Sequence, residues 1–252
     1  MAPQDWVDWH RDYDDPDSLL SQRGERVQGH LRAEFDRTPA GDIRLISLCA
    51  GQGRDVIGAL TGHPRRGDVR ARLVELDGAN VAHARQAAME AGLTGVEVLQ
   101  ADAGITDACA GAVPAQIVVA CGVFGNITSR DIRATVAALP TLCAPRALVL
   151  WTRHRSPPDL TPAIRSWFEE AGLREEAFDT SPDGFMAVGA HRLTGEPAPL
   201  TVGQRLFTFP GGRNNLSRLG AGPGSVFDKF GTGTDTGDTS GDCRGWTAAQ
   251  AP

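Results

Sequence analysis

Leu45-Ile46-Ser47-Leu48-Cys49-Ala50-Gly51-Gln52-Gly53-Arg54-Asp55-Val56-Ile57 is the stretch that decides the fold of this 252-residue chain. The apolar run from Ile43 to Cys49 is typical of a strand buried on both faces of a sheet. Gly51 and Gly53 let the backbone turn sharply and place no Cβ between the chain and a ligand. From Arg54 onward the apolar residues have helical spacing, so the first amide groups of a helix face whatever binds above the turn. The stretch predicts a strand, a glycine turn and a helix that bind a nucleotide-like ligand.

Two common nucleotide motifs fit this turn poorly. A dinucleotide fingerprint requires a third glycine where Val56 stands, and a P-loop requires a lysine that the turn lacks. The stretch resembles motif I of class I S-adenosylmethionine (SAM)-dependent methyltransferases. The resemblance implies that Ala50, Gly51, Gly53 and Asp55 contact SAM.

Bulk properties narrow the class of protein. A net charge of −6 argues against a broad phosphate-binding face, so we expect no nucleic-acid partner. The five cysteines form no C-x-x-C pair, which indicates reduced thiols in a cytoplasmic protein and no metal site. No apolar run approaches the roughly 20 residues of a membrane helix, so no membrane partner is expected. We expect an N-terminal helical and aromatic lid segment over 1–37, a SAM-binding domain over 38–210, and a Gly-rich disordered tail over 211–252.

The N-terminal segment is rich in aromatic and acidic residues, and helical spacing runs from Leu19 to Phe35. It reads either as an amphipathic segment packed on the sheet or as a lid over the site. The resemblance makes Tyr13 the residue that closes over SAM and Trp9 a substrate contact. Arg23 is a candidate to bind the SAM carboxylate, because a guanidinium suits that group.

Acidic residues follow the second predicted strand, Val69–Asp77, about 20 positions after the glycine turn. A carboxylate at this place in a doubly wound sheet accepts the ribose hydroxyls of an adenosine ligand. The family pattern assigns this role to Glu75, with Leu76 and Asp77 beside it. Asp77 is equally well explained as the N-cap of the helix predicted over Ala79–Ala91.

The third predicted strand, Val96–Gln100, leads into Ala101-Asp102-Ala103. The resemblance implies that Asp102 binds the adenine amino group, with Ala103 also at the cofactor. An isolated Asp after a strand is otherwise a turn former.

A Gly-rich loop, Gly122–Ile127, follows the fourth predicted strand, Ile117–Cys121. The resemblance places Cys121 and Gly122 against SAM. It makes Phe124 and Asn126 substrate contacts, although a packed Phe and a turn Asn explain them equally well.

The fifth predicted strand, Arg146–Thr152, runs into Arg153-His154-Arg155. His154 is the candidate catalytic base, and Arg153 and Arg155 are candidates to hold an anionic substrate. The alternative is a solvated loop whose charge complements the acidic body.

A helix over Pro162–Ala171 and two strands over Glu175–Asp179 and Phe185–Leu193 complete the pattern. The whole resembles the class I layout: an α/β doubly wound, seven-stranded, mostly parallel Rossmann-like sheet with an antiparallel last strand. The resemblance to this family covers about residues 43–193. Leu206–Phe209 is predicted to add a short edge segment.

The loop Cys121–Ile127 and the run Trp151–His154 resemble an actinobacterial-type subgroup of small-molecule methyltransferases. The function implied is methyl transfer to an O- or N-nucleophile of a small-molecule substrate, as in secondary metabolism, by a monomer or a homodimer. An RNA or protein methyltransferase, a SAM-binding protein that catalyses a non-methylation reaction, and an NAD-dependent oxidoreductase remain alternatives.

Overall fold

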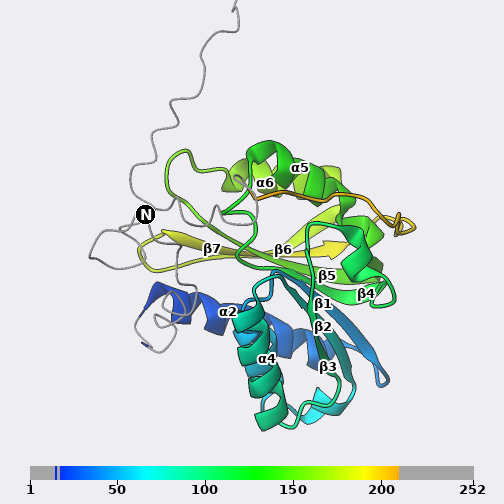
Figure 1. The fold of residues 1–252 in the computed structure, drawn as a ribbon. Helices are drawn as coiled ribbons and strands as arrows, with labels where there is room; N and C mark the ends of the chain where they lie inside the picture. Colours follow the sequence, from blue (N-terminus) through cyan, green and yellow to red (C-terminus); the bar gives the residue numbers. More distant parts are fainter. Residues whose placement is uncertain (1–14, 16–17, 210–252) are drawn as a thin grey trace, which may run out of the picture.

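The apolar runs of the sequence form one seven-stranded sheet in the computed structural model, which describes residues 15 and 18–209 (Figure 1). The strand order is β3-β2-β1-β4-β5-β7-β6. Strands β1 to β5 pair in parallel, whereas β7 is antiparallel to both β5 and β6. The predicted doubly wound α/β fold with an antiparallel last strand is therefore confirmed. The strands are β1 (Ile43–Leu48), β2 (Val69–Glu75), β3 (Val96–Gln100), β4 (Ala115–Ala120), β5 (Cys143–His154), β6 (Leu173–Thr180) and β7 (Met186–Leu193).

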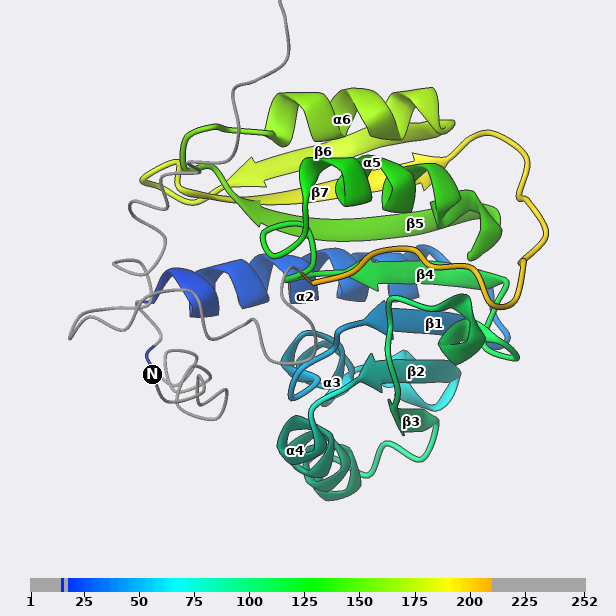
Figure 2. The same cartoon turned by 45° about the horizontal axis from the view of Figure 1, so that its top comes forward.

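Helices cover both faces of the sheet (Figure 2). Alternate residues of each strand enter opposite hydrophobic clusters, as a period of two requires. Leu45 and Ile117 pack with the layer of α2, α3 and α4, while Ile46 and Val118 pack with the layer of α5 and α6. The α-helices are α2 (Leu19–Arg37), α3 (Arg54–Leu60), α4 (Gly78–Glu90), α5 (Ser129–Ala138) and α6 (Thr161–Glu170), and the short 3₁₀ helices are η2 (Pro64–Gly67), η3 (Thr106–Cys109) and η4 (Leu139–Thr141).

Helix α2 packs on the sheet. Ser18 caps it by accepting a hydrogen bond from the Ser21 amide, so the helix begins at Leu19. Its apolar stripe includes Val27, Leu31 and Phe35, each with 0% exposure. The packed-segment interpretation accounts for this part of the N-terminal region. Trp9 and Tyr13 lie outside the described residues.

Strand β5 is longer than predicted. It continues through His154, because it pairs with β7 from Leu148 opposite Arg192 to His154 opposite Met186. This pairing makes Arg153 and His154 part of a strand, where the sequence indicated a loop.

The prediction of an extra edge segment near residue 206 is wrong. Residues 198–209, which we call the C-terminal strap, cross the face of the sheet alongside β4, between α5 and the chain that follows β3 (Figure 2). The strap makes a single isolated bridge, between Arg205 and Ile105, instead of pairing with a sheet edge. Leu206 and Phe207 are 3% and 2% exposed and enter the core with α5 and α6, because η3 is too short to cover that part of the sheet.

Cysteines of the described region are free thiols: Cys49, Cys109, Cys121 and Cys143. Burial raises the pKa of Cys109 to about 11 and that of Cys143 to about 12, so both stay protonated at neutral pH. Within residues 18–209, no helix combines the length and apolarity needed to cross a membrane. No three His, Cys, Asp or Glu side chains of that region lie together as metal ligands would.

Candidate functional site

The carboxyl ends of β1 to β5 meet at one edge of the sheet, where the predicted site residues gather. The glycine turn at the end of β1 is tightly wound, with φ of +52° at Cys49, +57° at Gly51 and +73° at Gly53. The left-handed conformation at Gly53 makes any other residue strained there, and a Cβ would also lie 2.8 Å from Ile57 Cδ1 and 2.9 Å from Leu73 Cδ1, so those side chains would have to shift. A left-handed conformation at a non-glycine residue such as Cys49 costs about 1–3 kcal/mol and is typical of functional loops.

Glu75 binds the glycine turn directly. One carboxylate oxygen accepts a hydrogen bond of 2.7 Å from the Gly51 amide, and the other accepts one of 2.8 Å from the Asp77 amide. The side chain is half-buried, and burial raises the pKa of its carboxyl. The backbone hydrogen bonds lower this pKa, whereas the nearby charge of Asp77 raises it. The amides of Gly51, Leu76 and Asp77 occupy about three of the roughly four acceptor positions of the carboxylate. The group therefore ties the end of β2 to the glycine turn at the carboxyl edge of the sheet.

Leu76 and Asp77 follow Glu75 on the same edge. Leu76 is an exposed large apolar side chain at 48%, which suits contact with a flat aromatic ring. Asp77 Oδ1 accepts hydrogen bonds from the Ala79 and Asn80 amides at 2.9 Å. Asp77 is thus the N-cap of α4, the structural role that the sequence also allowed.

Asp102 lies in a turn after β3. Its Oδ1 accepts a hydrogen bond of 2.8 Å from the Gly104 amide, and its Oδ2 lies 3.2 Å from Arg205 Nη1 of the C-terminal strap. The neighbouring Ala103 is buried. The turn-forming role of Asp102 is therefore present together with an ion pair that the sequence did not indicate.

Arg23 of α2 and Asp55 at the start of α3 face each other beside the glycine turn. Arg23 Nη2 lies 4.0 Å from Asp55 Oδ2, and the two side chains are 6% and 17% exposed. Burial raises the pKa of the Asp55 carboxyl, and the Arg23 guanidinium opposes this effect. Asp55 in turn helps to raise the pKa of the Cys121 thiol, after the larger effect of burial. The fold thus brings together Arg23, Asp55 and Cys121 from three separate segments.

The loop after β4 is held by two side chains. The Gly122 amide donates to Thr152 Oγ1 at 2.9 Å, and the Asn126 side-chain amide donates to the Gly122 carbonyl at 2.7 Å. Phe124 has 0% exposure and packs against Trp151 and Phe168. Phe124 is thus a packed side chain and Asn126 holds the turn, the two structural roles that the sequence also allowed. The sequence did not indicate a role for Thr152, whose position on β5 places its hydroxyl against the Gly122 amide.

Arg153 and His154 are not in a solvated loop. Arg153 is 9% exposed, donates to the Phe124 carbonyl, and has a buried Nε with no acceptor among the described residues. Burial lowers the pKa of its guanidinium. Burial and the adjacent Arg153 lower the pKa of His154 to about 4, so the imidazole is neutral at pH 7. By contrast, Arg155 is engaged by Asp159 at 3.0 Å and by the Gly184 carbonyl at 3.3 Å.

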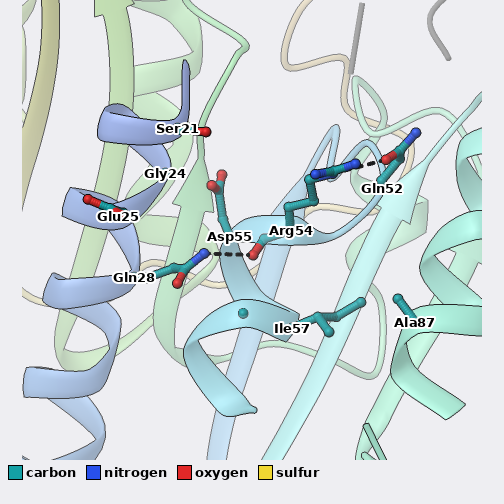
Figure 3. A pocket seen from close by; sticks show the side chains of 10 residues that line it. Ser21, Gly24, Glu25, Gln28, Gln52, Arg54, Asp55, Ile57 and Ala87 are labelled. Atoms are coloured by element: carbon teal, nitrogen blue, oxygen red, sulfur yellow. Dashed lines mark hydrogen bonds between the residues drawn. The ribbon is translucent and has the colours of Figure 1, made fainter. Parts of the chain in front are cut away.

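A groove of about 480 Å³ lies over the short α3, between α2 and α4 (Figure 3). Figure 3 shows the Gln28 amide bonded to the Arg54 carbonyl, and the Arg54 side chain bonded to Gln52. Asp55 also lines the groove, but Glu75 and the residues of the loop after β4 do not. The groove therefore lies beside the glycine turn and does not include the Glu75 carboxylate.

Comparison with known proteins finds similarity in three-dimensional structure alone: no family model and no curated protein matches the chain. An O-methyltransferase family protein from Burkholderia thailandensis is 18% identical with a TM-score of 0.54, covering 78% of this chain and 65% of its own. Magnesium protoporphyrin IX methyltransferase from Synechocystis, solved with bound SAM, is 14% identical with a TM-score of 0.55, covering 74% and 89%. A SAM-dependent methyltransferase from Aquifex aeolicus is 12% identical with a TM-score of 0.50, covering 76% and 100%. At these identities the likeness establishes the fold that the chain shares with SAM-dependent methyltransferases.

Proposed function

We propose that this protein is a SAM-dependent methyltransferase that acts on a small-molecule acceptor. The observation that carries the proposal is the Glu75 carboxylate at the end of β2, bonded to the Gly51 amide of the glycine turn. A carboxylate in this place binds the ribose hydroxyls of adenosine ligands in doubly wound folds. The residues fit the group, because the turn leaves no Cβ at Gly51 and Gly53 and the exposed Leu76 offers an apolar surface to adenine.

The proposed contacts follow the edge of the sheet. Glu75 would bind the ribose hydroxyls, and Asp102 would accept a hydrogen bond from the adenine amino group. Arg23 and Asp55 provide charges of both signs at the end of the turn where the methionine carboxylate and ammonium would be placed.

When bound, SAM supplies an electrophilic methyl group that needs little further activation. The protein must then hold a nucleophile in line with that methyl and exclude water. His154 is neutral at pH 7 and lies at the end of β5, so it can accept a proton from an O- or N-nucleophile. The buried Arg153 can bind an anionic group of the acceptor, whereas Arg155 is engaged by Asp159 and Gly184. We place this activity in the cytoplasm and in secondary metabolism.

Isothermal titration calorimetry with S-adenosylhomocysteine tests the cofactor site. We expect binding to the wild type, and a loss of about 1–3 kcal/mol in Glu75→Ala, because charge-assisted hydrogen bonds to the ribose are removed. Glu90→Ala, an exposed carboxylate on α4, is the matched control and should bind like the wild type. Wild-type protein that binds NAD and not S-adenosylhomocysteine would refute the proposal in favour of an oxidoreductase.

Isotope-labelled methyl groups separate the remaining alternatives. Label transferred from SAM to small molecules of a cell extract would support the proposal. Label that appears only in RNA or protein would show that the methyl acceptor is a macromolecule and not a small molecule. Cofactor binding without any label transfer would indicate a SAM-binding protein with another activity.

A further inference from the structure

We infer that the C-terminal strap is part of the cofactor site, and that Arg205 is a positioning residue that fixes the Asp102 carboxylate against the adenine amino group. The inference rests on the proposed function. It adds a residue from outside the seven strands, since the strap begins five positions after the last strand ends at Leu193.

The strap is anchored along its length to the elements that flank β4. Thr106 Oγ1 donates to the Thr201 carbonyl at 2.7 Å, and the Thr106 amide donates to the Gln204 carbonyl at 3.0 Å. On the other side, Thr135 Oγ1 of α5 donates to the Leu206 carbonyl at 2.8 Å. These bonds, together with the buried Leu206, hold the chain on both sides of Arg205.

Gly104 joins the strap closely to the Asp102 turn. The Leu206 amide donates to the Gly104 carbonyl at 2.8 Å. A Cβ on Gly104 would lie 2.5 Å from the Phe207 carbonyl oxygen and 3.0 Å from Asp102 Oδ1. Any larger residue would push the strap and the Asp102 carboxylate apart, so the two segments form one unit.

The Arg205–Asp102 ion pair is too exposed to be explained by stability. The two side chains are 49% and 43% exposed, and pairs of that kind contribute about 0–1 kcal/mol to folding. The pair does restrict the carboxylate, because the Gly104 amide binds Oδ1 while Arg205 binds Oδ2. Arg205 is itself aimed by a second bond from Nη1 to the Phe207 carbonyl, at 3.3 Å.

A carboxylate fixed in this way has a defined preference. Its remaining lone pairs accept from an amino group and repel a carbonyl oxygen, so it favours adenine over hypoxanthine. Holding the group before the ligand arrives reduces the entropy lost on binding. Arg205 thus acts through Asp102 on the choice of base, without needing to touch the base itself.

The test compares S-adenosylhomocysteine with S-inosylhomocysteine, which has a carbonyl in place of the 6-amino group. We expect the wild type to prefer the adenosine compound by calorimetry. Arg205→Met should weaken binding of the adenosine compound by about 3- to 10-fold, or about 0.7–1.4 kcal/mol, and leave the inosine compound within about twofold. The ratio of the two affinities therefore falls, and Arg205→Lys should restore part of it.

Asp107→Asn is the matched control. Asp107 Oδ2 accepts a hydrogen bond of 2.8 Å from the Gly203 amide, so this variant weakens an anchor of the strap without touching the ion pair. We expect it to keep the wild-type ratio. An unchanged ratio in Arg205→Met, or an equal fall in both variants, would overturn the inference while the wild type still binds S-adenosylhomocysteine. A wild type that binds neither compound would instead overturn the proposed function.

Discussion

Replacing Arg192 with Met should destabilise the protein, because this residue joins helix α2 to the sheet. Arg192 of β7 is 7% exposed at its side chain and makes a two-pronged ion pair with Glu34 of α2, at 2.6 and 2.8 Å. It also binds Glu176 of β6 and the Arg146 carbonyl. The hydrogen bonds that Arg192 donates to Glu34, together with the ion pairs, raise the pKa of the guanidinium. The substitution removes the charge and leaves the Glu34 carboxylate, itself 7% exposed, without its main partner.

Two observations set the magnitude of this loss. Removing one partner of a buried ion pair costs about 3–5 kcal/mol. Arg37 Nη1 lies 3.6 Å from Glu34 Oε2 and remains as a weaker, exposed partner, which favours the lower part of that range. We therefore expect Arg192→Met to lose about 3–4 kcal/mol in the free energy of unfolding at pH 7.

Urea unfolding followed by circular dichroism measures this loss. Arg37→Met is the control, because that side chain is 58% exposed and meets Glu176 and Glu34 from the solvent side. It should cost less than about 1 kcal/mol. The double variant Glu34→Leu and Arg192→Met should recover most of the loss. A deficit below about 1 kcal/mol in Arg192→Met would refute the reasoning.

Three further outcomes are expected. His154→Ala should lower turnover of labelled SAM and leave the affinity for S-adenosylhomocysteine intact, and full turnover would remove His154 from the mechanism. Burial lowers the pKa of His191 to about 4. As pH falls from about 6.5 to 4, this residue is therefore protonated in the unfolded chain and still neutral in the folded chain. The stability measured in urea should therefore fall over that window by about 3 kcal/mol for this group, and His191→Gln should flatten the slope. Arg65 donates to four backbone carbonyls between α2 and β1, so Arg65→Met should cost about 2–3 kcal/mol in urea, whereas the exposed Arg66→Met should stay within about 0.5 kcal/mol.

Local patterns were sufficient to predict the sheet. The apolar run before Gly51, the acids at the end of β2 and the Gly-rich exit of β4 are each short-range signals, and the carboxyl ends of parallel strands must meet at one edge. The same rule puts Glu75 at that edge, whereas its hydrogen bond with the Gly51 amide is a contact that the sequence did not indicate.

The details that the sequence did not predict depend on contacts between distant segments. Arg155 looked equivalent to Arg153, yet only the fold places Asp159 and the Gly184 carbonyl beside it. The apolar alternation at 206–209 was visible, but an alternating pattern does not say whether a segment joins a sheet edge or covers a face. The Arg205–Asp102 pair spans 103 residues of sequence, beyond the reach of any local pattern.

The C-terminal strap also determines where the chain can be shortened or fused. A boundary drawn after the last strand would delete Phe207, whose side chain is 2% exposed, and would uncover the apolar surface beside α5. Losing a buried Phe costs about 3–5 kcal/mol, a large part of the 5–15 kcal/mol that holds most domains folded. A tag or partner domain joined at Leu193 in place of the strap should therefore give an aggregation-prone protein.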